Sequence, residues 1–153
     1  MGIFHYKLEI VPKQYVETFA DPLPKDLLNN GLLPWLQVKP NEEMLNNLRV
    51  LLPNDNSWPG GDVEEYVTNN EWGSDCRIWK ENGRVESIEF RYSPGADNWD
   101  LMEKFIGIVK KCEYKLVNLR SGKVLNPEEY EIKYDISKSV AIKFLKDPEG
   151  TIL

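Results

Sequence analysis

The sequence predicts an α+β fold, a mostly antiparallel sheet of about five strands with helices packed on one face. Two patterns support this prediction. Several short segments alternate between apolar and polar residues, as half-buried strands do. Between them lie segments with an apolar residue at every third or fourth position, which is typical of helices. With 153 residues, the chain is expected to be a single globular domain, 1–153, that buries roughly two-thirds of its unfolded surface.

The segment from Cys76 to Tyr92 predicts a central β-hairpin. Its turn signal is Asn82-Gly83, a dipeptide that tolerates positive φ angles. A two-residue loop would set Arg77 opposite Ile88 and mix charge into the apolar face. We therefore expect a three-residue bulged loop, Glu81-Asn82-Gly83, with Gly83 in the left-handed region. The apolar residues of the two strands then share one face: Cys76, Ile78, Ile88 and Phe90.

The first strand is expected from Ile3 to Val11, where polarity alternates, with His5 on the polar face as a solvated or locally bonded side chain. Residues 21–40 contain four prolines among leucines and Trp35, so they cannot form one long helix. We expect them to wrap over the core as irregular turns. In the chosen hairpin register Trp79 points outward, where either this wrap or a partner would cover it.

Asn41 is the expected N-cap of a helix whose apolar stripe runs from Met44 to Leu52 and ends at Pro53. A loop is expected from Asn54 to Asp75. Its charge is one-sided, because it contains six acids and no lysine or arginine. The acids are Asp55, Asp62, Glu64, Glu65, Glu71 and Asp75.

After the hairpin, Asp97 or Asn98 caps an expected helix from Trp99 to about Lys111. A strand from Tyr114 to Leu119 and a short returning strand from Lys123 to Leu125 follow.

Two patterns disagree over residues 126–136. Asn126-Pro127-Glu128-Glu129 is typical of a helix start, whereas the apolar residues beyond it recur at the period of a strand. We favour the helix. A final helix is expected from Ser139 to Lys146, ended by Asp147-Pro148.

The composition excludes several classes of function. A net charge of −6 argues against binding nucleic acid or anionic membranes. The N-terminus has no apolar run that would make a signal peptide or a membrane span, so we expect a cytoplasmic protein. Cys76 and Cys112 are expected to be reduced thiols, and with one histidine they cannot complete a zinc site. Asn54-Asp55-Asn56 lacks the glycine and glutamate of a calcium loop. We expect no cofactor, no metal and no catalytic residue.

Six short motifs lie between about Leu45 and the C-terminus: Leu52-Pro53, Ser57-Trp58, Trp72-Gly73, Ile88-x-Phe90-Arg91, Ser139-x-Ala141-x-x-Phe144 and Asp147-Pro148. Together they resemble a group of small uncharacterised bacterial proteins encoded near polymorphic-toxin or Rhs-type elements. Small acidic proteins in such places often serve as immunity factors. The resemblance implies no catalytic residues. In that group an Asp commonly follows the central arginine, whereas this chain has Tyr92.

The sequence is compatible with three functions. The first is a non-enzymatic, acidic protein-binding module, with a cationic toxin as the hypothetical partner. The second is a small enzyme or ligand-binding domain with a carboxylate-lined pocket between the acidic loop and the sheet. The third is an interaction protein without a discrete site. The missing catalytic motifs and the clustered acids favour the first, whose expected docking residues are Asp55, Trp58, Asp62, Glu64, Glu65, Glu71, Trp72 and Asp75.

Overall fold

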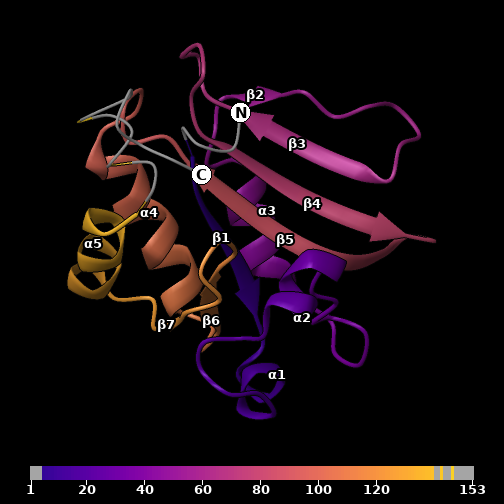
Figure 1. The fold of residues 1–153 in the computed structure, drawn as a ribbon. Helices are drawn as coiled ribbons and strands as arrows, with labels where there is room; N and C mark the ends of the chain where they lie inside the picture. The colour runs from indigo at the N-terminus through magenta and orange to yellow at the C-terminus, as the bar shows by residue number, and fades with distance from the viewer. Residues whose placement is uncertain (1–4, 140–141, 143–145, 147–153) are drawn as a thin grey trace.

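The computed structural model describes residues 5–139, 142 and 146. These residues form an α+β fold, in which five helices surround one antiparallel sheet of seven strands in the order β2-β3-β4-β5-β1-β6-β7 (Figure 1). The elements are, along the chain, β1 (Tyr6–Val11), α1 (Lys13–Glu17), α2 (Lys25–Asn30), α3 (Glu42–Arg49), β2 (Asn54–Asp55), β3 (Val63–Val67), β4 (Asp75–Glu81), β5 (Arg84–Tyr92), α4 (Trp99–Lys110), β6 (Lys115–Asn118), β7 (Val124–Leu125) and α5 (Glu129–Ser137).

The predicted α+β class is confirmed, but the described sheet has seven strands rather than about five. The two unexpected strands, β2 and β3, lie inside the segment 54–75 that was predicted as a loop. β3 pairs with β4 along its whole length, from Val63 opposite Trp79 to Val67 opposite Asp75. The acid-rich segment is therefore built into the sheet.

The β4–β5 hairpin has the predicted faces. Cys76 lies opposite Phe90 and Ile78 lies opposite Ile88, and all four side chains are fully buried. Arg77, on the other face, lies opposite Glu89. The apolar pattern therefore identified the core side of the hairpin correctly.

The predicted three-residue turn is wrong. Glu81 pairs with Arg84, so the loop consists of Asn82 and Gly83 alone, with φ angles of 52° and 78°. The register shifts instead inside the ladder, where Trp79 pairs with Ser87 but Lys80 pairs with Val85. This β-bulge leaves Glu86 as the extra residue of β5 and restores the apolar pairing that a plain two-residue hairpin would break.

The three longest helices cover one face of the sheet, as the sequence predicted. In Figure 1, α3 lies behind the sheet and α4 and α5 lie at its side. Their buried residues, such as Leu48, Phe105 and Ile132, join the apolar face of the central strands in one hydrophobic cluster. Phe90 and Phe105 stack with their ring centroids 4.1 Å apart, which fixes α4 against β5.

A second, smaller apolar cluster lies on the opposite face of the sheet. It joins Val11 and Val117 of the sheet to Val16, Leu23 and Leu32. As expected, the proline-rich segment 21–40 wraps over the core, although it contains the short helix α2 and is preceded by α1, which was not predicted. Trp35 is buried and donates its indole N–H to the carbonyl of Ile10 (3.2 Å), which pins the wrap to β1.

The helix caps at Asn41 and Asn98 form where the sequence predicts them. Asn41 accepts a hydrogen bond from the Met44 N–H (2.9 Å), and Asn98 accepts one from the Asp100 N–H (3.1 Å). The helix favoured over residues 126–136 is confirmed as α5. The final helix predicted from Ser139 to Lys146 lies mostly outside the described residues, as does the start of the predicted first strand at Ile3.

Candidate functional site

The residues predicted to dock a partner are spread over β2, β3, the start of β4 and the loops on either side of β3. Trp58 and Asp62 precede the strand, beside the closed end of the β4–β5 hairpin, where the Asp62 carbonyl accepts a hydrogen bond from the Lys80 N–H (2.7 Å). Glu71 and Trp72 lie in the turn that follows the strand. Five strand residues span about 14 Å, so the two ends are separate surfaces.

Glu64 forms ion pairs with basic side chains of the same chain. Its carboxylate accepts from Arg49 Nε of α3 at 2.8 Å and lies 3.1 Å from Lys80 Nζ. Burial pushes the pKa of Glu64 upward, but hydrogen bonds from Arg49, Tyr66 and Lys80 outweigh it and lower the pKa to about 2. The charge of Glu64 therefore holds β3 against α3.

Glu65 and Asp75 are paired on the other face of the sheet. Arg77 Nε lies 2.9 Å from Glu65 and 3.7 Å from Asp75. Arg91 forms a bidentate pair with Asp75, whose Oδ1 lies 2.7 Å from Arg91 Nε. Asp75 is buried. Of the six predicted acids, only Asp55, Asp62 and Glu71 are exposed.

A different group of acids gathers at the closed end of the hairpin. Glu86, the bulge residue, forms a hydrogen bond with Glu81, which raises the pKa of Glu86 above its ordinary value. Desolvation and the charges of Glu81 and Asp62 raise this pKa further. We call the surface formed by Trp58, Asp62, Trp79, Glu81 and Glu86 the hairpin-end patch.

Two tryptophans of the patch are exposed. Trp58 is 78% exposed. It begins a turn in which the Gly61 N–H donates a hydrogen bond to the Trp58 carbonyl (3.0 Å). Trp79 is 37% exposed on the outer face of β4, as the hairpin register predicted, and it lines a cavity together with the segment around α2. Trp72, at the far end of β3, is 55% exposed. The sequence pattern points to Trp58 and Asp62 but not to Glu81 and Glu86. Glu81 and Glu86 are ordinary polar residues of the hairpin pattern, so nothing marks them.

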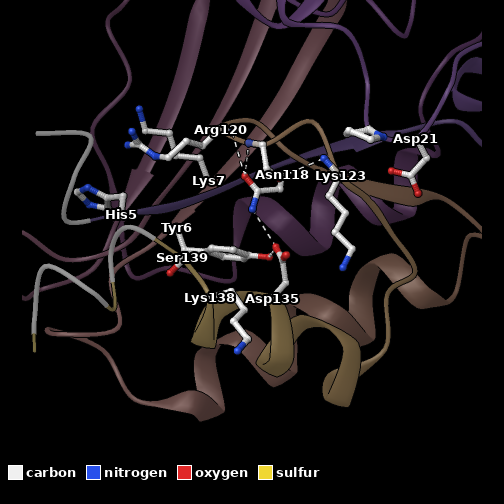
Figure 2. Close-up of a pocket in the computed structure, with 12 residues that line it drawn as sticks. His5, Tyr6, Lys7, Asp21, Asn118, Arg120, Lys123, Asp135, Lys138 and Ser139 are labelled. Atoms are coloured by element: carbon white, nitrogen blue, oxygen red, sulfur yellow. Dashed lines mark hydrogen bonds between the residues drawn. The ribbon is translucent and has the colours of Figure 1, made fainter. Parts of the chain in front are cut away.

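A cavity of opposite charge lies at the start of β1 (Figure 2). It has a volume of about 550 Å³. We call it the basic cavity, because its cationic lining residues are Lys7, Arg120, Lys123 and Lys138. Figure 2 shows Lys7 and Arg120 side by side, away from the carboxylate of Asp135. This arrangement favours anionic groups over cationic ones at the Lys7 side of the cavity.

The inner wall of the basic cavity is a buried hydrogen-bond network. Asp135 of α5 accepts from the Tyr6 hydroxyl and from Asn118 Nδ2 (2.8 Å). Burial, and next the contact with Asp135, raise the pKa of Tyr6 far above its usual value, so the phenol stays protonated. The network ties β1, β6 and α5 together. A tyrosine held in this way is a donor and not a general base.

His5 also borders the basic cavity, but its predicted environment is wrong. The side chain is buried rather than solvated, and its Nε2 lies 2.9 Å from the carbonyl of Gly73, which is distant in sequence. The contact links the start of β1 to the β3–β4 turn.

The described residues offer no other obvious chemistry. Cys76 and Cys112 are free thiols, and burial raises the pKa of Cys76 to about 12. Within the described part of the chain, no three His, Cys, Asp or Glu side chains are grouped so as to hold a metal ion. Every helix there is too short or too polar to serve as a membrane span.

The chain matches no protein-family model, no curated protein and no solved structure.

Proposed function

We propose that this protein is a non-enzymatic protein-binding module that docks a cationic protein on the hairpin-end patch. The observation that carries the proposal is the gathering of Asp62, Glu81 and Glu86 at one end of the sheet. No ion pair among the described residues joins any of the three to a lysine or arginine, although Glu64, Glu65 and Asp75 nearby are all paired.

Three neighbouring acids repel one another, as the raised pKa of Glu86 reflects. A lysine or arginine of a partner would remove this repulsion. Trp79 lies on β4 two residues before Glu81, and Trp58 lies on the turn that leads to Asp62; both are exposed. Such tryptophans are typical anchors of protein interfaces, because they bury a large area while losing few rotamers. The patch therefore combines a charge that attracts a basic surface with side chains that hold it.

The kind of partner follows from the sign of the charge. A toxin that acts on nucleic acid carries a basic face, and an acidic module that covers this face would neutralise it. The six motifs that resemble bacterial polymorphic-toxin immunity proteins support the same role. We further propose that the protein acts in the cytoplasm, where free thiols such as Cys76 and Cys112 stay reduced.

The test compares three immobilised proteins in lysate from the source organism. They are the wild type, the patch variant Asp62→Lys/Glu81→Lys and the control Glu17→Lys/Glu103→Lys. Glu17 and Glu103 are exposed acids on α1 and α4, so both variants change the net charge equally. Proteins retained by the wild type and the control but lost from the patch variant are identified, purified and measured for association rate over a salt series.

The expected result is a basic protein whose association with the wild type at low salt is about tenfold faster than with the patch variant. The difference should shrink toward physiological salt, where the Debye length is about 8 Å. If the patch variant and the control retain the same proteins, the hairpin-end patch is not a docking surface.

A further inference from the structure

A second cavity, of about 540 Å³, lies between the outer face of the sheet and the segment around α2. It shares Lys7 and Arg120 with the basic cavity, and Figure 2 shows these two side chains together. Leu28 and Leu32 supply apolar wall opposite the sheet. The polar and aromatic lining from the sheet side consists of Lys7, Glu9, Trp79, Glu86, Ser87, Glu89 and Arg120, of which Trp79 and Glu86 also belong to the hairpin-end patch.

Glu9 is the unusual member of this lining. The residue is 3% exposed, and its Oε2 has no hydrogen-bond partner among the described residues. Buried polar atoms are nearly always satisfied, so an orphaned carboxyl oxygen in a cavity wall points to a donor supplied from outside the chain. Burial, and next the charge of Glu89, raise the pKa of Glu9 well above its usual value, although a hydrogen bond with Ser87 opposes the shift.

The charges around Glu9 are segregated by sign. On the outer face of the sheet, Glu9 of β1 lies directly opposite Glu89 of β5. The neighbouring pair on the same face is Lys7 opposite Arg91. Like charges in directly opposed positions destabilise a sheet. The cavity wall thus has an acidic end and a basic end along one strand.

Of the β5 members of these pairs, Arg91 is bound by Asp75 of β4. Glu89 lies opposite Arg77 in the ladder, but the ion pairs of Arg77 among the described residues are with Glu65 and Asp75. No ion pair among the described residues includes Lys7 or Glu9. Two residues along a strand span about 7 Å. The Cα atoms of Lys7 and Glu9 are therefore about 7 Å apart. One cation and one carboxyl group, each lacking an ion-pair partner among the described residues, line the same cavity.

We propose that this cavity binds a small zwitterion, whose ammonium group donates to Glu9 Oε2 and whose carboxylate lies against Lys7 and Arg120. We choose an ω-amino acid with a chain of about five carbons, because its charged ends lie roughly 6 to 7 Å apart when extended, close to the backbone spacing of Lys7 and Glu9. The methylene chain packs between Trp79 and Leu28. This site goes beyond the docking proposal and does not depend on it.

Binding of the ligand's ammonium group is coupled to the loss of a proton from Glu9. The titratable and charged groups that face Glu9 are Lys7 on the same strand, Glu86 and Glu89 on β5, Tyr15 on α1 and Arg120 beyond β6. Burial and the charge of Glu89 favour the protonated, neutral form of Glu9 by raising its pKa. When the ammonium group arrives, Glu9 becomes a carboxylate and releases its proton to the buffer, while the ligand keeps both of its charges.

The test is isothermal titration calorimetry at pH 7 with three probes of equal length, 5-aminopentanoate, pentylamine and pentanoate. They are titrated into the wild type, Glu9→Gln and Lys7→Gln. We expect the wild type to bind 5-aminopentanoate with a Kd on the order of 1 mM or tighter, and at least about tenfold more tightly than either single-charge probe. Repeating the titration in buffers of different ionisation enthalpy should show one proton released per ligand.

The variants separate the two ends of the site. Glu9→Gln should lose about tenfold or more in affinity for 5-aminopentanoate and should release no proton. In Lys7→Gln the preference for 5-aminopentanoate over pentylamine should be smaller than in the wild type, because Arg120 alone then faces the carboxylate. If the wild type binds none of the probes, or if Glu9→Gln binds 5-aminopentanoate as the wild type does, the proposal is wrong.

Two controls keep the result interpretable. Glutamine has the shape and zero charge of the protonated acid that burial favours at Glu9, so Glu9→Gln should unfold at or above the wild-type temperature at pH 7. The patch variant Asp62→Lys/Glu81→Lys leaves the zwitterion contacts unchanged and should bind 5-aminopentanoate normally. Failure of the docking proposal would therefore not mimic failure of this one.

Discussion

Ile78 lies directly opposite Ile88, although the turn that joins their strands contains only two residues. The bulge at Glu86 makes this possible, since it shifts the partner strand by one residue between the turn and the core. The hairpin thus combines a tight turn, which needs two positive φ angles, with the register that buries its apolar residues.

Gly83→Ala should destabilise the protein. Gly83 has a φ of 78°, a conformation that disfavours a side chain by about 1 kcal/mol, or roughly 2 to 4 °C in Tm for a chain of this size. The matched control is Gly107→Ala in the middle of α4, where a Cβ would contact nothing within 4 Å. That change should stabilise by about 0.5 to 1 kcal/mol. Thermal unfolding that moves both variants in the same direction would contradict the prediction.

Asp75→Ala should be the most damaging change among the predicted docking acids. It leaves Arg91, whose side chain is 13% exposed, without its carboxylate, and weakens the surroundings of Arg77. Removing one partner of such a pair costs about 3 kcal/mol. Asp62→Ala, at an exposed site, should change the free energy of unfolding by less than about 0.5 kcal/mol. Urea unfolding of the two variants measures the contrast, and equal midpoints would refute it.

Glu64 should make the protein sensitive to acid. Its folded pKa of about 2 lies below the ordinary value of 4.5, so its contribution is complete above pH 4.5 and is lost as the pH falls toward 2. The contribution is on the order of 3 kcal/mol at most. Glu64→Gln should therefore be less stable than the wild type at pH 6, with a gap that narrows by pH 3. Glu17→Gln, at an exposed ion pair, should show no such convergence in urea unfolding.

The sequence predicted those parts of the fold that local periodicity determines. The faces of β4 and β5 follow from side chains that alternate with a period of two, and the caps at Asn41 and Asn98 follow from local hydrogen bonding. β3 was missed because Glu64 occupies its core-side face. A helix residue fifteen positions earlier, Arg49, neutralises that carboxylate, and no local pattern records such a partner.

The candidate sites were less predictable for the same reason. Glu86 is brought to Asp62 by a bulge, and a bulge between polar residues leaves no trace in the hydrophobic pattern. The alternation that put His5 on the polar face of the first strand puts Glu9 there too, and Glu9 is indeed on the outer face of β1. Its burial comes from the segment around α2, whose irregular path over that face could not be derived from prolines and leucines alone.

The two edges of the described sheet are formed by its shortest strands, β2 and β7, of two residues each. The backbone N–H and C=O groups of a long edge strand are a template on which other chains pair, which leads to aggregation. Here the longer strands are all interior, and each edge exposes few such groups. The described sheet therefore offers another chain little opportunity to extend it with a strand.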